Sequence, residues 1–167
     1  MDRFFISGPS KIKGTIKLSG SKNASLPILA ATILFDEPVE IKNLPNVKDI
    51  STMLDLIKSL GFIVTKNKVK NSVIIQKKNI KTFASYSLVK TMRAGILVLG
   101  PLVSKYRKAI TSLPGGCLIG ARPVNFHLNA LGKLGMKHQI RKGYIYANAK
   151  KGLKGSIIKF PQISVGA

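Results

Sequence analysis

Acidic residues are scarce in this sequence and absent from most of its length. Only six of the 167 residues are Asp or Glu and none follows Asp55, whereas 28 are Lys or Arg. Two histidines and one cysteine complete the common metal ligands. Metal sites need several such side chains at defined spacing, so we expect no metal site. The sequence has no Walker motif either, and we expect no other cofactor.

Disulfide bonds and membrane spans are also unsupported. A single cysteine cannot form an internal disulfide, and unpaired thiols suit a reducing cytosol. The longest uncharged apolar runs, residues 26–35 and 94–103, have about ten residues, fewer than the roughly 18 that span a bilayer. The first residues lack the apolar core of a secretion signal. We therefore expect a cytoplasmic protein with no membrane partner.

The excess of basic residues permits two interpretations. The formal net charge is +22, as a nucleic-acid-binding module would show. Aromatic residues do not alternate with the lysines, so stacking platforms for bases are missing. We expect a solvated basic surface and no nucleic-acid partner, and we keep a basic nucleic-acid-binding module as the alternative. Such a module would lose affinity steeply with added salt.

Hydrophobic periodicity predicts two copies of one βαβαββ unit, which is an α/β fold. The first copy comprises strands at 4–6, 14–18 and 38–44, helices at 23–35 and 49–60, and a hairpin of 62–64 and 72–75. The second comprises helices at 89–103 and 126–134, a strand at 109–113, and a hairpin of 136–141 and 144–147. Residues 154–160 repeat 13–18 and begin a third unit.

A glycine-rich loop at residues 113–123 interrupts the second copy. Pro45 and Gly61 are 16 residues apart in the first copy, whereas Pro114 and Gly135 are 21 apart in the second. The five extra residues fall in the loop, which holds Cys117 among glycines and close to Arg122. A neighbouring guanidinium favours a thiolate, and loops added to a scaffold often carry function. The alternative is a buried, inert cysteine.

A second candidate site lies where the first helix begins. Pro27 has no N–H, so we expect regular helical hydrogen bonding to begin near it and to leave the preceding N–H groups free for an anion beside Lys22. The alternatives are that Lys22 is a surface lysine and that Asn23 is only a helix cap.

These two motifs resemble those of the UDP-N-acetylglucosamine enolpyruvyl transferases. The resemblance rests on residues 18–24 and 114–123 and extends over the whole chain, including 90–94 and 164–167. It implies an inside-out α/β barrel domain of three βαβαββ units, and a second such domain. Residues 1–21 would then belong with that distal domain, 22–153 would form two units with the catalytic loop at 114–123, and 154–167 would start a truncated third unit.

The resemblance also implies a reaction. Phosphoenolpyruvate would give its enolpyruvyl group to the 3-hydroxyl of UDP-N-acetylglucosamine and release phosphate, the first committed step of peptidoglycan biosynthesis. Catalytic roles would fall to Lys22, Asn23 and Cys117. Phosphoenolpyruvate would be bound by Lys22, Arg93 and Arg122. The UDP-sugar would be bound by Asn23, Arg93, Arg122, Pro123, Val124, Asn125, Phe126, Ser164, Val165 and Gly166.

Some details qualify this resemblance. Asn125 stands where members often have Asp, and Gln162 where some have Lys. Arg93, taken alone, is typical of a helix surface, and we expect His127 to be structural. The sister enolpyruvylshikimate-phosphate synthases share the architecture, but the cysteine loop argues against them. Because the remaining distal domain would be a required partner, we expect the chain alone to be inactive.

Overall fold

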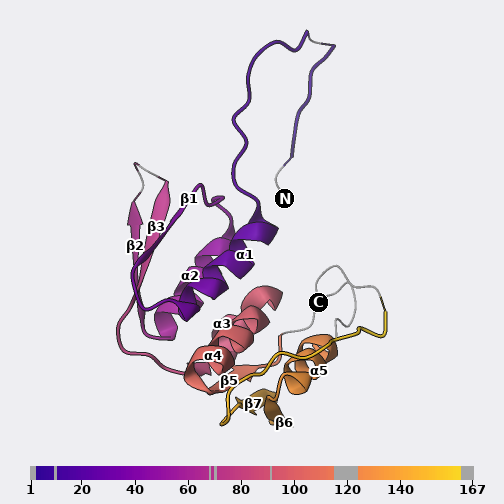
Figure 1. The fold of residues 1–167 in the computed structure, drawn as a ribbon. Coiled ribbons are helices and arrows are strands. Elements are labelled where there is room, and N and C mark those ends of the chain that lie inside the picture. The colour runs from indigo at the N-terminus through magenta and orange to yellow at the C-terminus, as the bar shows by residue number, and fades with distance from the viewer. Residues whose placement is uncertain are drawn as a thin grey trace.

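The computed structural model describes residues 3–9, 11–67, 69, 71–90, 92–114 and 124–162 (Figure 1). Its first unit comprises α1 (Lys22–Ala31), η1 (Thr32–Leu34), β1 (Val39–Lys42), α2 (Lys48–Ser59), β2 (Phe62–Asn67) and β3 (Ser72–Lys77), where η denotes a 3-10 helix. The strands form an antiparallel sheet in the order β1-β3-β2. Ile75 of β3 lies opposite Val39 of β1 and Val64 of β2.

The second unit repeats this order. It comprises β4 (Phe83–Ala84), α3 (Tyr86–Val89), η2 (Arg93–Val98), α4 (Leu99–Tyr106), β5 (Lys108–Ser112), α5 (Asn125–Lys133), β6 (Lys137–Arg141) and β7 (Tyr144–Asn148). The sheet order is β4-β5-β7-β6, in which β4 runs parallel to β5 and the other pairs are antiparallel. In both units the last strand lies in the middle of its sheet, beside the strand that precedes the second helix. The predicted repeat is therefore confirmed for this part of the chain.

The helices from α1 to α4 lie between the two sheets, whereas α5 buries only Leu128. α1 packs on α2 and η2, α2 covers β2, and α4 packs on both η1 and β5. Figure 1 shows α1 and α2 between the first sheet and the helices of the second unit. The largest fully buried helical side chains are Leu29, Ile33, Met53, Leu54, Leu56, Ile57, Val89, Leu99 and Leu102. This arrangement confirms the predicted α/β class with helices inside.

Two glycines mark the same position in both units. Gly61 and Gly135 follow α2 and α5 with φ of +92° and +105°, a conformation that glycine adopts without steric cost. The residue before each glycine accepts a hydrogen bond from the chain that leaves the hairpin. Lys81 N–H donates to Leu60 at 2.9 Å, and Lys154 N–H donates to Leu134 at 2.8 Å. The Leu-Gly pair is therefore repeated because both units need a glycine with positive φ after a leucine whose carbonyl accepts this hydrogen bond.

The strands predicted at 4–6, 14–18 and 154–160 are wrong. These segments contain neither helix nor strand, and in Figure 1 the N-terminal segment extends away from the rest. Phe5 is 92% exposed and Ile157 is 94% exposed. A strand needs a partner for its backbone hydrogen bonds, and no described strand pairs with these segments. In contrast, β4 pairs with β5 although the sequence analysis did not predict it.

The helix predicted at 89–103 is broken into three pieces. α3 ends at Val89, Met92 is extended with φ of −144°, and a 3-10 helix precedes α4. The break brings Gly95 against Val89, where an added Cβ would lie 3.0 Å from Val89 Cγ1. Pro101 falls in the first turn of α4, where no intrahelical N–H is needed. Tertiary packing has overridden the helical pattern.

Asp36 connects the two units. Its carboxylate accepts hydrogen bonds from Lys77 Nζ of β3 at 2.6 Å and from Lys105 Nζ of α4 at 2.7 Å. Lys105 Nζ also donates to the Leu34 carbonyl at 2.7 Å. The hydrogen bonds from Lys105 and then Lys77 lower the pKa of Asp36 to about 2. The interaction with Asp36 in turn raises the pKa of Lys77.

Asp36→Asn is expected to remove an acid-sensitive part of the stability. The folded pKa of about 2 lies below the ordinary value of 3.8 for an aspartate, so the stabilisation is present above about pH 4 and is lost as the pH falls toward 2. Thermal unfolding from pH 7 to pH 2 should show a smaller decline for Asp36→Asn than for the wild type. Glu37→Gln is the control, because the exposed Glu37 forms no ion pair with any described residue. Identical profiles for wild type and Asp36→Asn would contradict the assignment.

Candidate active site

The first turn of α1 presents Lys22 and Asn23 to solvent. Ser21 is the N-cap, and its hydroxyl accepts a hydrogen bond from Ala24 N–H at 3.4 Å. Ser25 N–H donates to the Ser21 carbonyl at 2.9 Å, so regular pairing begins well before Pro27. The prediction that it begins near Pro27 is therefore wrong, and Ser21 rather than Asn23 is the cap. The N–H groups of Lys22 and Asn23 remain without intrahelical partners, as in any first turn.

Because Pro27 has no N–H, one hydrogen bond to the first turn of α1 is missing. In a regular helix the residue at 27 would donate to the Asn23 carbonyl. Asn23 therefore keeps a backbone acceptor without its helical donor, next to an exposed amide side chain. Its amide can both donate and accept hydrogen bonds. This combination suits a hydroxyl-bearing ligand such as a sugar.

Gly20 determines where this turn lies. A Cβ at Gly20 would collide with the carbonyl oxygen of Asn43 and would lie 3.5 Å from Pro45 Cδ. Asn43 itself has a φ of 57°, directly after β1. Only glycine permits this close approach of the two backbones. The glycine of the predicted motif thus seats the start of α1 against the loop between β1 and α2.

Lys22 forms an ion pair that the sequence analysis did not predict. Its Nζ lies 3.0 Å from Asp49 Oδ2, and the two side chains are 48% and 38% exposed. Asp49 is in the first turn of α2, where a carboxylate interacts favourably with the helix dipole. The only signal in the sequence was an acid at a predicted helix start. The pair joins the first turns of α1 and α2.

Arg93 enters from the second unit. It is the first residue of η2, which packs against α1, and it is half-buried. The break after α3 places it at a helix start rather than in the middle of a long helix. The structure therefore brings Lys22, Asn23 and Arg93 onto two elements that pack together.

The remaining predicted site residues divide into two groups. Val124 is 9% exposed, so its side chain belongs to the core. Asn125 and Phe126 begin α5, with Asn125 exposed. Six predicted residues lie outside the described residues, and their roles stay predictions: Cys117, Arg122, Pro123, Ser164, Val165 and Gly166.

The residues that flank the cysteine loop include two unsatisfied buried atoms. Ser112 Oγ, at the end of β5, and His127 Nδ1, in the first turn of α5, have no hydrogen-bond partner in the described part of the chain. Burial lowers the pKa of His127, so its imidazole is neutral at pH 7. Leu113 N–H donates to the Gly143 carbonyl at 2.8 Å and ties the start of the loop to the hairpin turn.

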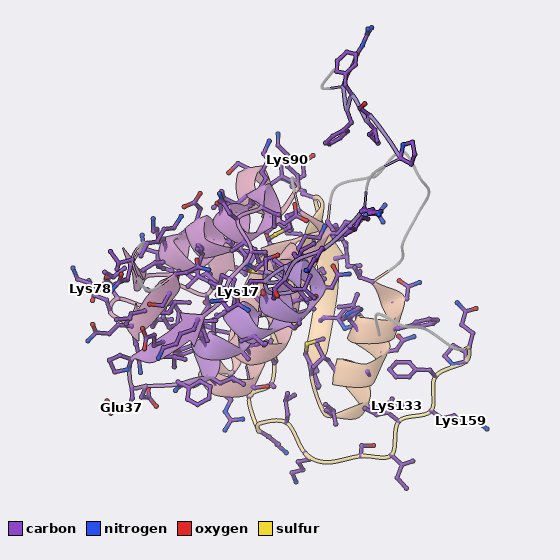
Figure 2. The ribbon with its side chains drawn as sticks, turned by 90° about the horizontal axis from the view of Figure 1, so that it is seen from above. Lys17, Glu37, Lys78, Lys90, Lys133 and Lys159 are labelled. Atoms are coloured by element: carbon purple, nitrogen blue, oxygen red, sulfur yellow. The ribbon has the colours of Figure 1, made fainter. Side chains whose placement is uncertain are left out.

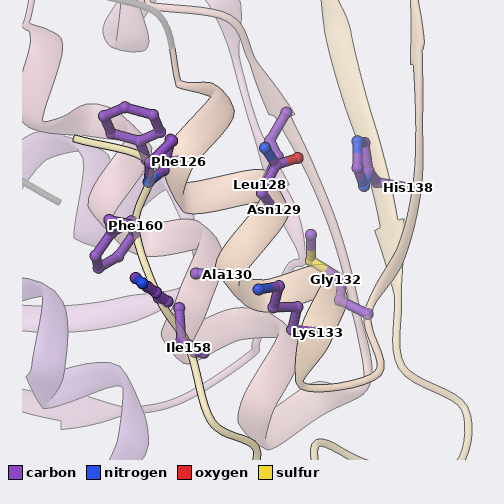
Figure 3. A pocket seen from close by; sticks show the side chains of 12 residues that line it. Phe126, Leu128, Asn129, Ala130, Gly132, Lys133, His138, Ile158 and Phe160 are labelled. Carbon is purple, nitrogen blue, oxygen red and sulfur yellow. The ribbon is translucent and has the colours of Figure 1, made fainter.

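An apolar groove lies beside α5. It has a volume of about 540 Å³, and Figure 3 shows Phe126 and Phe160 next to each other on one side of it. Their ring centroids are 5.8 Å apart. Leu128 and Met136 continue the wall from α5 and the turn that follows it. Phe126 thus packs against the segment after β7, a contact that the sequence analysis did not predict.

Charge is distributed unevenly between the units. Every carboxylate among the described residues belongs to the first unit, because the chain has none after Asp55. The lysines labelled in Figure 2, such as Lys78, Lys90 and Lys159, lie on different sides of the molecule. The described residues contain no group of three or more His, Cys, Asp or Glu that could hold a metal ion. Among them, no helix is long and apolar enough to cross a membrane.

Gly20→Ala is expected to displace the start of α1 and to destabilise the protein by about 1–3 kcal/mol, as overpacking does. The new Cβ would meet the Asn43 backbone, which cannot move aside as a side chain would. Urea unfolding measures the loss. Gly155→Ala is the control, because an added Cβ there meets nothing within 4 Å. Equal stability of the two variants would refute this account of Gly20.

The chain is similar to carboxyvinyltransferases in sequence. The family described as EPSP synthase (3-phosphoshikimate 1-carboxyvinyltransferase) matches residues 6–167. The UDP-N-acetylglucosamine 1-carboxyvinyltransferase of Pelagibacter ubique (strain HTCC1062) is 61% identical over 167 residues, which are 100% of this chain and 40% of that relative. The protein of the same name from Hamiltonella defensa is 50% identical over 168 residues, again 100% of this chain and 40% of the relative.

Solved structures share the fold. The enolpyruvyl transferase NikO from Streptomyces tendae has a TM-score of 0.72 at 19% identity, covering 88% of this chain and 32% of that one. An EPSP synthase from Acinetobacter baumannii has a TM-score of 0.69 at 16% identity, covering 92% of this chain and 36% of that one. The chain therefore spans about 40% of the length of the curated relatives above and about a third of these structures.

Proposed function

Because the chain belongs to the EPSP synthase (3-phosphoshikimate 1-carboxyvinyltransferase) family, we propose that it forms part of an enzyme that transfers a carboxyvinyl group to UDP-N-acetylglucosamine. The observation that carries this proposal is the 61% identity, over the whole chain, to a relative named for that acceptor. A 3-phosphoshikimate acceptor is the second candidate, because the family description names it. The solved EPSP synthase is only 16% identical, so the sugar nucleotide is favoured.

Phosphoenolpyruvate carries a phosphate and a carboxylate, and the proposed site supplies cations for both. Lys22 provides a point charge at the start of α1, beside N–H groups without intrahelical partners. Arg93 provides a planar guanidinium from η2, which packs on the same helix. Arg122 adds a third cation from the loop. Together they would neutralise and orient the anion for attack.

The proposed reaction proceeds by addition and then elimination. The 3-hydroxyl of the acceptor gives its proton to a general base and adds to C2 of phosphoenolpyruvate, while C3 gains a proton from a general acid, which gives a tetrahedral phospho-adduct. Loss of a C3 proton and of phosphate then leaves the enol ether. Cys117 would take part in this acid chemistry, and Asn23 would hydrogen-bond the sugar and the adduct. Closure of the cysteine loop would exclude water.

The nucleotide would lie along residues 122–126, with 164–166 near its phosphates. The buried side chain of Val124 leaves only its backbone for such a contact. Asn125 is exposed at the start of α5 and offers a neutral amide. Phe126 already packs against Phe160, so it would contribute one face of its ring at most.

Cys117 is expected to be alkylated by an epoxide phosphonate that mimics phosphoenolpyruvate. These 167 residues contain only one cysteine, so intact mass gives the number of adducts in the completed protein and peptide mapping shows whether Cys117 carries one. UDP-N-acetylglucosamine should accelerate the reaction by closing the loop. The measurement uses this chain completed by the part of the Pelagibacter ubique relative that follows the matched region. Cys117→Ser is the control, and absence of an adduct at saturating nucleotide would contradict the assignment.

The chain alone is expected to release no phosphate from phosphoenolpyruvate and UDP-N-acetylglucosamine. It spans 40% of its relative, and none of its carboxylates lies in a predicted site motif, so a general base must come from elsewhere. Activity should appear when the remaining part of the relative is added as a second polypeptide. The same mixture assayed with 3-phosphoshikimate tests the second acceptor. Steady turnover by the 167 residues alone would show that the base has been misplaced.

A further inference from the structure

Lys22 lies at a position that is electrostatically unfavourable for a cation. It lies in the first turn of α1, where the helix dipole is positive and disfavours an ammonium. α1 has no acidic residue in that turn to compensate. The carboxylate of Asp49, 3.0 Å away on α2, supplies the missing negative charge.

We propose that Asp49 is a positioning residue, which holds the Lys22 ammonium at the junction of α1 and α2 for binding of the phosphoenolpyruvate anion. This inference rests on the proposed function and deepens it. An ammonium has three donors and Asp49 occupies one, so two remain for an incoming phosphate or carboxylate. The carboxylate would act through Lys22 and would not contact the reacting atoms.

The backbone that carries each residue of the ion pair is fixed by packing and capping contacts. Gly20 seats the start of α1 against Asn43, and Ser21 caps the helix. Asp49 is followed by Ile50 and Met53, which are 4% and 0% exposed and fix the first turn of α2 in the core. The flexible part is the lysine stem, and the ion pair restrains it. Restraint of a reacting or binding group is worth most where its geometry must be accurate.

A second ion pair on α2 shows what a purely superficial contact looks like. Lys58 Nζ lies 3.7 Å from Asp55 Oδ1 within one helix, and the two side chains are 48% and 59% exposed. Such local pairs add little to stability. The pair between Lys22 and Asp49 is shorter, joins two helices and involves a less exposed carboxylate. Asp55→Asn is therefore the matched control for Asp49→Asn.

The first test measures the position of Lys22 in the 167-residue chain and needs no activity. Limited acetylation with acetic anhydride, followed by peptide mass mapping, gives the relative rate at each lysine. Asp49→Asn should change the rate at Lys22 by up to about fivefold, the most that an exposed ion pair supports. Asp55→Asn should leave Lys22 unchanged. Equal rates at Lys22 in the wild type and in Asp49→Asn would overturn the inference.

The second test measures catalysis by the completed enzyme. Asp49→Asn should lower kcat/KM for phosphoenolpyruvate by about tenfold, between the effect of an exposed ion pair and the roughly hundredfold cost of a 1 Å misplacement. The KM for UDP-N-acetylglucosamine should not change. Asp49→Glu should restore part of the loss. In a Lys22→Ala background, Asp49→Asn should have no further effect, because Asp49 acts only through Lys22.

The outcomes separate this inference from the proposed function. An equal loss with and without Lys22, or tighter phosphoenolpyruvate binding by Asp49→Asn, would overturn the positioning role. If the completed wild type used 3-phosphoshikimate instead, the proposed acceptor would be wrong, but the same comparison with phosphoenolpyruvate would still decide the role of Asp49. If it used neither acceptor, the proposed function would fail while the acetylation result still showed whether Asp49 holds Lys22.

Discussion

Burial of helices between the two sheets is the constraint on which the rest of the structure depends. α2 packs on β2 of the first sheet on one side and on η2 and α3 on the other, and α1 packs on α2 and η2. Fully burying one Leu or Ile stabilises the fold by about 1.5–3 kcal/mol, and α2 alone buries Ile50, Met53, Leu54, Leu56 and Ile57. The candidate site lies at the N-terminal ends of these helices, so packing of the second unit against the first also assembles the site.

The same constraint explains why the second helix of the second unit is less buried than that of the first. α5 occupies the position of α2 in the repeat, yet it buries only Leu128, while its other side borders the groove that Phe126 and Phe160 line. In the first unit the corresponding helix is covered by elements of the unit that follows. A helix with one buried residue depends on further contacts for its stability. The difference between α2 and α5 is therefore a difference in neighbours, because both helices end with the same Leu-Gly pair.

Features that depend on a local sequence pattern were predicted correctly, whereas features that depend on contacts between distant residues were not. The helical stripe from Ile50 to Leu60 and the hairpin with Lys142-Gly143 at its turn, whose φ values are 48° and 77°, are local signals and were predicted correctly. The break before Arg93 depends on the packing of Gly95 against Val89, which periodicity cannot reveal. Lys22 and Asn23 could be proposed as site residues because a sequence motif contains them. Asp49 was missed because only the folded chain brings it to Lys22.

The loops that follow β1 and β5 occupy the same position in the repeat but differ in length and in the residues that they contain. In the first unit the loop is short: Asn43 contacts Gly20, and a few residues later Asp49 pairs with Lys22. In the second unit the equivalent connection, residues 113–124, is seven residues longer than residues 43–47 and contains Cys117. Connections at the carboxyl ends of strands are where α/β folds place their ligands. The short loop therefore leads directly to the carboxylate that pairs with Lys22, and Cys117, a proposed catalytic residue, falls in the same connection of the next unit.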